Sequence, residues 1–222
     1  MRTFLVSATP FLLGALVLLR WLDGTLIYYV ADRYTLLVAG GAVFLVLLGL
    51  LSPLYRHALS HVKVLVRPWQ IIFLLLPILF GFIISPSPLS AQTAMQRGVG
   101  QQLPAYLTPE PFSFAVDSSK RSFGDWANIL FSRGDKSRFA GQDANISGFI
   151  TIDGDNMYLT RFQVSCCAAD GRPMGILLEA DQDLKSNTWW QVSGQMQMND
   201  AGEIYLDATE MTPIEIPSNP YV

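Results

Sequence analysis

Two cysteines stand side by side in this 222-residue chain, at Cys166 and Cys167 in the string RFQVSCCAADGRPMGI, and the sequence contains no others. A thiol pair can bind a soft metal ion or a trivalent metalloid, or take part in thiol exchange. A disulfide between adjacent residues closes a small strained ring and makes a poor structural staple. We therefore take Cys166 and Cys167 as candidate metal ligands, and Arg161 and Asp170 of the same string as further candidate binding residues.

The residues alone leave other roles open for this pair. One cysteine could be buried as a small apolar residue while the other has no role, or the thiols could pair with another protein. Neighbours on a regular strand point to opposite faces, so the two thiols share a site only where a bulge or a strand end intervenes. Asp170-Gly171 supplies a turn close behind the cysteines.

The residue types around the cysteines restrict the chemistry further. Four methionines lie in the same predicted barrel region, at Met157, Met174, Met196 and Met198. Thioethers help thiolates to select soft ions, but methionine also fills gaps in hydrophobic cores. No histidine lies in this half of the chain, which disfavours an ordinary zinc site. The sequence has no phosphate-binding loop, nucleophile elbow or metalloprotease helix, and we therefore expect a protein that is not an enzyme.

The cysteines lie in a region whose apolar residues alternate and whose turns contain Gly, Asp and Asn. Five strands are predicted, in the runs 145–152, 157–167, 175–180, 189–198 and 203–214. Short strands with interior glycines suit a barrel that must bend. The prediction is a small antiparallel OB-like barrel in an extracytoplasmic β domain over residues 111–222, with a small sandwich as the alternative. A short helix over 122–133 precedes it, with Ser122 as N-cap and Asp125 completing a capping box.

The first part of the chain is much more apolar. Helices are predicted over about 3–22, 34–55 and 68–86, each long enough to cross a bilayer. No small-residue cleavage site follows the first of them, which favours an uncleaved span over a signal peptide. We therefore predict a membrane domain over residues 1–87, followed by a linker over 88–110 that is rich in Pro, Ser, Gly and Gln.

Charge separates the two parts and predicts an orientation. Residues 1–89 carry a net charge of +4 and residues 90–222 a net charge of −7. The short second loop holds Arg56, Lys63 and Arg67, so the positive-inside rule places it and the N-terminus in the cytoplasm. Three spans then deliver the β domain to the outside of the membrane. An acidic domain in that compartment argues against nucleic acid as a partner.

Several strings resemble one family. They are DGTLIYYVADRY at residues 23–34, SFGDWANILFSRGDKSRFAGQDANISGFI at 122–150, RFQVSCCAADGRPMGILLE at 161–179 and WWQVSGQM at 189–196. Together they are similar to the YcgQ-like bacterial membrane proteins, a family of permease subunits, and RFxxSCCAAD is the most specific element. The resemblance implies a bacterial plasma (inner) membrane location, a polytopic YraQ-like permease as partner, and no catalytic residues.

Two functions from different classes follow. The first is an accessory subunit of a membrane permease complex, whose exported barrel recognises or hands over substrate. The second is a membrane-anchored protein that binds thiol-seeking soft metal or metalloid species by itself. The transported solute, its direction and any cofactor are not specified by these residues.

Overall fold

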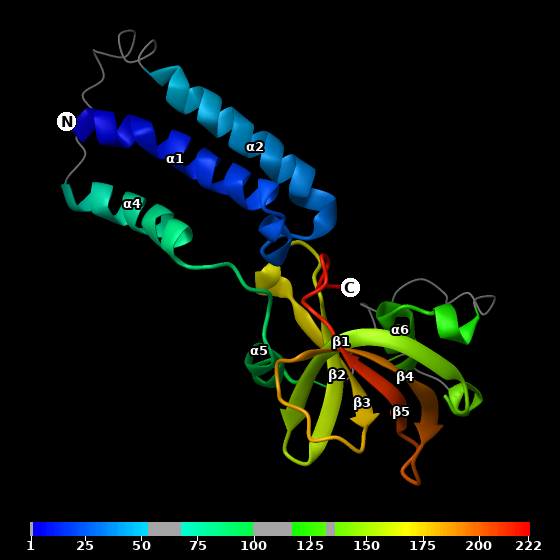
Figure 1. Ribbon diagram of the computed structural model, residues 1–222. Coiled ribbons are helices and arrows are strands. Elements are labelled where there is room, and N and C mark those ends of the chain that lie inside the picture. Colours follow the sequence, from blue (N-terminus) through cyan, green and yellow to red (C-terminus); the bar gives the residue numbers. More distant parts are fainter. Residues whose placement is uncertain (1, 53–67, 100–116, 132–135) are drawn as a thin grey trace. The chain divides into compact units, whose positions relative to one another are not determined.

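The structure is a computed structural model that describes residues 2–52, 68–99, 117–131 and 136–222 (Figure 1). It divides into two compact units. The first contains residues 1–88 together with the segment 166–168, and the second contains residues 89–165 and 169–222. The basic loop on which the predicted orientation depends, with Arg56, His57, His61, Lys63 and Arg67, lies outside the described residues, so that orientation stays a prediction.

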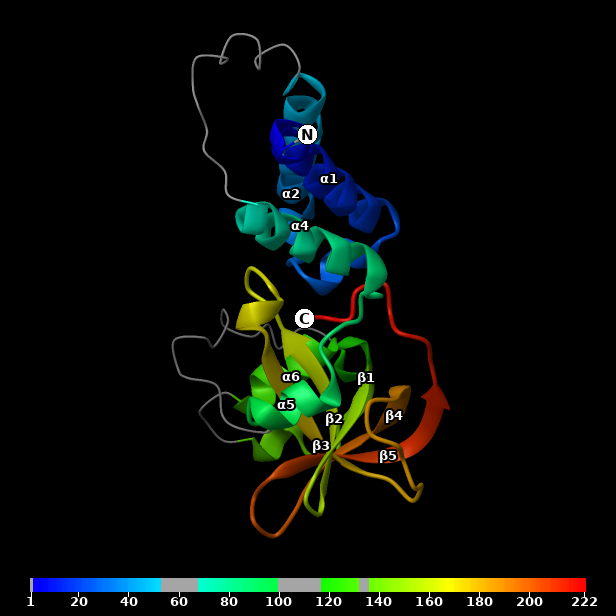
Figure 2. The same cartoon turned by 90° about the vertical axis from the view of Figure 1, so that its left-hand side faces the viewer.

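The first unit consists of helices α1 (Arg2–Leu22), α2 (Asp32–Leu50) and α4 (Pro68–Ile83), with the 3-10 turn η1 (Thr25–Tyr28) between the first two. Helices α1 and α2 lie side by side in both views (Figures 1 and 2). Two glycines allow this close packing. A Cβ atom on Gly14 would lie 2.6 Å from the Ala42 carbonyl oxygen, and one on Gly49 would lie 2.8 Å from the Phe11 nitrogen. Small residues let apolar helices approach at backbone distance.

Arg20, at the end of α1, joins two parts of the first unit. Its Nη1 forms a 3.1 Å ion pair with Asp23, and its Nη2 donates a 2.8 Å hydrogen bond to the Gly81 carbonyl of α4. Nearby, a Cβ on Gly81 would lie 2.5 Å from the Leu16 side chain. Helix α4 therefore packs closely against α1 near Gly81, and the hydrogen bond from Arg20 links the two helices there.

The three predicted helices exist, but they differ in their capacity to span a membrane. Within the described residues, α2 is long and apolar enough to cross one by length and composition. The other apolar helical stretches, Ala8–Leu22 and Ile72–Ile83, are shorter than that requirement. An apolar helix near the N-terminus could serve as a membrane anchor or as a signal sequence. Of the three predicted spans, α2 therefore has the length and composition to cross a membrane. Membrane spanning by α1 and α4 stays a prediction.

The second unit is mainly β. Its strands are β1 (Asp143–Asp153), β2 (Asn156–Gln163), β3 (Arg172–Glu179), β4 (Trp189–Met198) and β5 (Ile204–Pro213). Their pairing closes a ring in the order β1-β2-β3-β5-β4. Strand β1 closes it because its first half pairs with β4 and its second half with β2. A register shift between Ser193 and Gly194 of β4 marks the bend for which interior glycines are suited.

The prediction of a wholly antiparallel barrel is wrong in one pair. Strands β3 and β5 run parallel, while the other four pairs are antiparallel. The physical reason is the odd number of strands. Directions alternate from neighbour to neighbour in an antiparallel sheet, and a closed ring of five strands cannot alternate throughout. One parallel pair is the minimum, and the sheet is accordingly mixed.

Helix α6 (Phe123–Phe131) packs on the barrel. It confirms the helix predicted over 122–133 up to residue 131, where the described residues stop. Ser122 and Asp125 form the predicted capping box. The Ser122 backbone N–H donates to Asp125 Oδ2 at 2.9 Å, and the Asp125 N–H donates to Ser122 Oγ at 3.2 Å. Trp126 and Ile129 turn inward and are buried in the core. An amphipathic stripe of this kind buries its apolar face against the sheet.

Part of the predicted linker is structured. Within residues 88–110, the described residues form helix α5 (Ala91–Gln96), whose Ala91 and Ala94 are buried. Ser90 caps this helix, and the Ala91 N–H donates to Asn187 Oδ1 at 3.0 Å. Figure 2 shows α5 against the barrel. The small residues of this segment suggested a linker, but they also allow a short helix to lie close to a sheet.

Candidate functional site

The candidate site is the loop that leaves β2. The predicted strand over 157–167 ends at Gln163, so the cysteines lie beyond it, before the 3-10 turn η5 (Ala168–Asp170). A local hydrogen bond accounts for this correction. Asp170 Oδ1 accepts a 2.9 Å bond from the Ser165 N–H, which offers the backbone an alternative to the strand ladder.

Leaving the strand brings the two thiols together. The Sγ atoms of Cys166 and Cys167 lie 3.6 Å apart in a thiol–thiol hydrogen bond. Both side chains are thiols, since a disulfide would bring the sulfurs to about 2.05 Å. Cys166 is exposed and Cys167 is half-buried. The pair is therefore open to a reagent or an ion.

Asp170 completes the group. One ligand atom from each of Cys166, Cys167 and Asp170 lies within 4.8 Å of the others. In the described ranges, no other group of three His, Cys, Asp or Glu side chains meets this criterion. Two soft sulfurs and one hard oxygen suit a soft ion that accepts a third, weaker ligand. The structure thus brings together three of the four candidate binding residues.

The backbone of the cysteine segment is paired. Within the first unit, Cys167 forms an isolated antiparallel bridge with Val30. The Ala31 N–H donates to the Cys166 carbonyl at 3.0 Å, and the Ala168 N–H donates to the Tyr29 carbonyl at 2.9 Å. Backbone hydrogen bonds therefore fix the chain at Cys166 and just after Cys167. A fixed backbone reduces the conformational entropy that the cysteine segment would lose on binding an ion.

Arg161, the fourth candidate, does not belong to this group. It lies on β2, where its Nη2 donates a 2.9 Å hydrogen bond to Ser147 Oγ and its guanidinium lies 5.5 Å from the centre of the Trp189 ring. Burial lowers the pKa of Arg161, because desolvation disfavours the charged form. The side chain has a local structural role in the barrel wall, and RFxxSCCAAD is not one contiguous site.

The methionines belong to the core. Met174 and Met196 are fully buried among the inward-facing residues of the barrel, and Met157 and Met198 pack partly buried against the same cluster. Sulfur in these positions fills gaps between aliphatic side chains. The alternative in which methionines assist the thiols as soft ligands finds no support in their placement.

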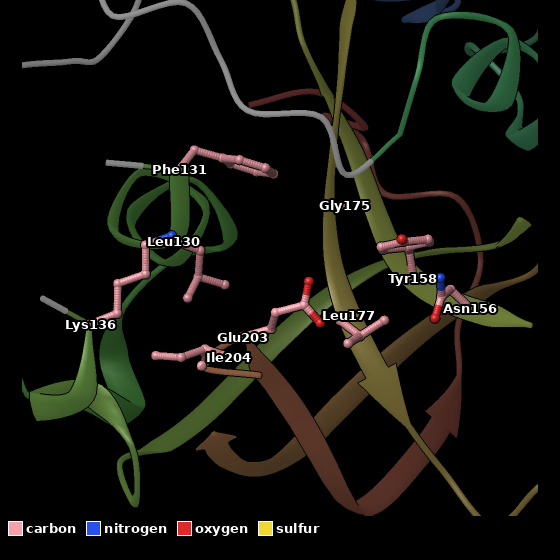
Figure 3. Close-up of a pocket in the computed structure, with 10 residues that line it drawn as sticks. Leu130, Phe131, Lys136, Asn156, Tyr158, Gly175, Leu177, Glu203 and Ile204 are labelled. Atoms are coloured by element: carbon pink, nitrogen blue, oxygen red, sulfur yellow. The ribbon is translucent and has the colours of Figure 1, made fainter. Parts of the chain in front are cut away.

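Sequence reasoning missed a second feature, a cavity of about 310 Å³ in the second unit (Figure 3). It lies between α6, β2, β3 and the turn before β5, and its polar side chains include Tyr158 and Glu203. Forty-five residues separate these two in the chain, and neither belongs to a motif. No local pattern could therefore have signalled that they share a cavity.

The second unit is thus a mainly-β domain in which helix α6 precedes the five strands. Residues 116–222 match the model of the DUF1980 C-terminal domain. The matched residues of this chain include α6, the strands β1 to β5 and the cysteine loop. This match is consistent with the resemblance to the YcgQ-like proteins. No curated protein matches the chain.

Proposed function

We propose that this protein is an accessory subunit of a bacterial membrane permease complex, which holds a ligand-handling barrel at the outer surface of the plasma membrane. One observation carries the proposal: a single chain joins an apolar helical unit to a closed mainly-β domain. Such a chain is equipped to anchor, to contact a partner and to bind.

The surface of the helical unit supports the membrane part of the proposal. Leu36 and Leu37 of α2 are each 74% exposed, and Phe73 of α4 is 69% exposed. Other large apolar side chains continue this surface: Phe44, Leu47, Leu50, Ile72, Leu79 and Ile83. Soluble monomers seldom leave so many large apolar side chains of two helices exposed to water. Lipid and the helices of a polytopic YraQ-like permease would cover it, with α1 and α4 crossing the membrane beside α2.

The strand order supports the assignment of the barrel. A five-stranded ring with β1 shared between β2 and β4, and with one parallel pair between β3 and β5, suits an OB-like barrel. Barrels of this type bind ligands through a strand face and the loops beside it. An acidic charge of −7 over residues 90–222 disfavours nucleic acid as that ligand.

Affinity purification tests the complex. The tagged full chain is purified from its native membranes in mild detergent, and the retained proteins are identified and quantified by mass spectrometry. We expect a polytopic permease at a fixed ratio to the tagged chain. A matched variant, Leu36→Lys plus Leu37→Lys, should retain less of that permease than wild type. A chain that is purified alone, and whose deletion changes no solute flux, overturns the proposal.

The cysteines themselves report the orientation, because the sequence contains no other thiols. A membrane-impermeant maleimide should label Cys166 in intact cells if the barrel faces outward. Labelling that requires permeabilised cells would place the barrel in the cytoplasm and contradict the exported location. Cys166→Ser plus Cys167→Ser is the unlabelled control.

The second candidate function is binding of a soft metal or metalloid species by the cysteine loop. The grouping of Cys166, Cys167 and Asp170 within 4.8 Å favours it. Titration of the purified full chain with Cd²⁺ should produce a thiolate-to-metal charge-transfer band in the ultraviolet. Cys166→Ser plus Cys167→Ser should abolish that band, and Asp170→Asn should weaken binding without abolishing it. No saturable band in the wild type would remove this candidate.

A further inference from the structure

The cavity in the second unit has one apolar wall and one polar wall. Figure 3 shows Leu130 and Phe131 of α6 on one side and the ends of β2 and β3 on the other. Leu177 and Ile204 line the space between them. At about 310 Å³, it lies at the small end of the range for sites that bind small molecules. It can hold a compact apolar body but not an extended chain.

Glu203 supplies the charge at the polar wall. Its backbone N–H donates to Asn199 Oδ1 at 2.9 Å, and its Oε2 accepts a 3.1 Å hydrogen bond from Asn199 Nδ2. These bonds hold the carboxylate beside the cavity. In the part of the chain that the structure describes, its other oxygen, Oε1, has no hydrogen-bond partner. A positioned carboxylate therefore retains one acceptor for a ligand.

Tyr158 of β2 also lines the cavity. Burial, followed by the negative charges of Asp153 and Glu203, raises the pKa of its phenol. A phenol hydroxyl can accept a hydrogen bond, and the carboxylates of Asp153 and Glu203 place this one in a negative field. That field is favourable to a cation and unfavourable to an anion.

An adjoining hollow extends the negative surface. It shares Asn156 and Leu177 with the cavity, and its acidic side chains are Asp155, Glu179 and Asp200. Among the described residues that line the two hollows, Lys136 is the one with a cationic side chain, and it stands beside α6 rather than on the strands. Among the described residues, the ligand atoms that lie close enough together to hold a metal ion are in the cysteine loop and not among these carboxylates. A cluster of acidic side chains beside an apolar cavity instead attracts an organic cation.

We propose that this cavity binds a small amphipathic organic cation, whose ammonium group contacts Glu203 and Tyr158 and whose apolar body packs against Leu130, Leu177 and Ile204. The ammonium would donate to Glu203 Oε1 and replace water there with a charge-assisted hydrogen bond. The apolar walls would remove the body of the ligand from water. This inference uses none of the cysteine-loop residues and does not rest on the permease role.

Calorimetric titration of the purified full chain tests the inference with three probes of similar shape. They are 2-phenylethylammonium, the neutral 2-phenylethanol and the anionic 3-phenylpropanoate, each corrected for its heat of dilution into empty micelles. We expect saturable binding of the ammonium and, because its charge-assisted bond is lost, about tenfold weaker binding of the alcohol. The carboxylate should not bind.

Variants separate the cavity from nonspecific attraction to an acidic surface. Glu203→Gln should weaken ammonium binding about tenfold. Glu210→Gln removes an equal charge from an exposed position on β5 outside both hollows and should leave binding unchanged. Lys136→Met removes a like charge and should leave the affinity equal or higher. Tyr158→Phe serves as a second polar-wall variant should Glu203→Gln not fold by circular dichroism.

Three results would overturn the inference. They are the absence of saturable ammonium binding, equal affinities for the ammonium and the alcohol, and equal losses in Glu203→Gln and Glu210→Gln. The last result would identify diffuse charge attraction in place of a site. A failure here leaves the permease proposal standing, because that proposal is tested by its membrane partner.

Discussion

The Sγ atoms of Cys166 and Cys167 lie 3.6 Å apart even though adjacent residues on a strand would point to opposite faces. The arrangement exists because β2 ends at Gln163 and the loop after it is shaped by the bond from Ser165 to Asp170. The thiol pair is therefore a property of the loop. Its chemistry can be tested without disturbing the barrel strands.

The two thiols should differ in reactivity. Cys166 is exposed and Cys167 is half-buried, so a small maleimide should alkylate the remaining thiol of Cys167→Ser faster than that of Cys166→Ser. Mass spectrometry of timed, quenched samples measures both rates. Denatured samples of the two variants provide the control, in which the rates should converge. Equal rates in the folded variants would contradict the difference in exposure.

Helix α1 should separate from α2 when a side chain is added at their closest approach. Gly49→Ala would place a Cβ 2.8 Å from the Phe11 backbone nitrogen, and the resulting overpacking should cost about 1–3 kcal/mol of unfolding free energy. Thermal unfolding in detergent micelles measures the loss. Gly40→Ala is the matched control on the same helix, because nothing lies within 4 Å of its Cβ. That variant should match or exceed wild-type stability, since alanine favours a helix.

The capping box of α6 should contribute measurably to the stability of the second unit. Ser122→Ala removes the acceptor of the Asp125 N–H and the partner of its carboxylate, and should cost about 0.5–2 kcal/mol. Chemical denaturation followed by tryptophan fluorescence, to which the buried Trp126 contributes, measures the change. Ser218→Ala, at an exposed position, should have no effect. Equal stabilities for the two variants would show that the cap is unimportant.

Alkaline pH should destabilise the second unit through Tyr158. Burial, followed by the charges of Asp153 and Glu203, raises the pKa of its phenol in the folded state, so the folded chain holds this proton more tightly than the unfolded chain. The unfolded phenol titrates near about pH 10. The contribution of Tyr158 is therefore fully present below that pH and is lost as the pH rises through the folded pKa.

Unfolding measured between neutral and strongly alkaline pH checks this linkage. Tyr158→Phe should flatten the fall in stability above about pH 10, because it removes the titrating group. Glu203→Gln should reduce the same fall, since it removes one of the two negative charges that raise the pKa. Tyr29→Phe, at an exposed position in the first unit, is the control. An unchanged alkaline slope in Tyr158→Phe would contradict the predicted role of this phenol.

Local patterns predicted most elements of this protein. Apolar runs predicted α1, α2 and α4, the Ser122 and Asp125 signature predicted the start of α6, and alternation predicted the five strands within a few residues. Each of these signals depends on neighbours in the chain, through helical or strand periodicity and through capping. The same kind of signal misplaced the end of β2, because the side chain of Asp170 competes for the backbone there.

The amino-acid sequence alone divides the chain into an apolar, basic part and an acidic β part, and it alone shows two adjacent thiols and no others. Composition and periodicity carry this information without reference to distance in space. Only the tertiary structure decided that β3 and β5 pair in parallel, that Cys166, Cys167 and Asp170 meet while Arg161 stays apart, and that Tyr158 and Glu203 share a cavity. The parallel pair and the shared cavity depend on how a closed ring of five strands brings distant segments together, and no pattern of neighbouring residues encodes that closure. The cysteine group depends instead on where β2 ends and on the bond from Ser165 to Asp170.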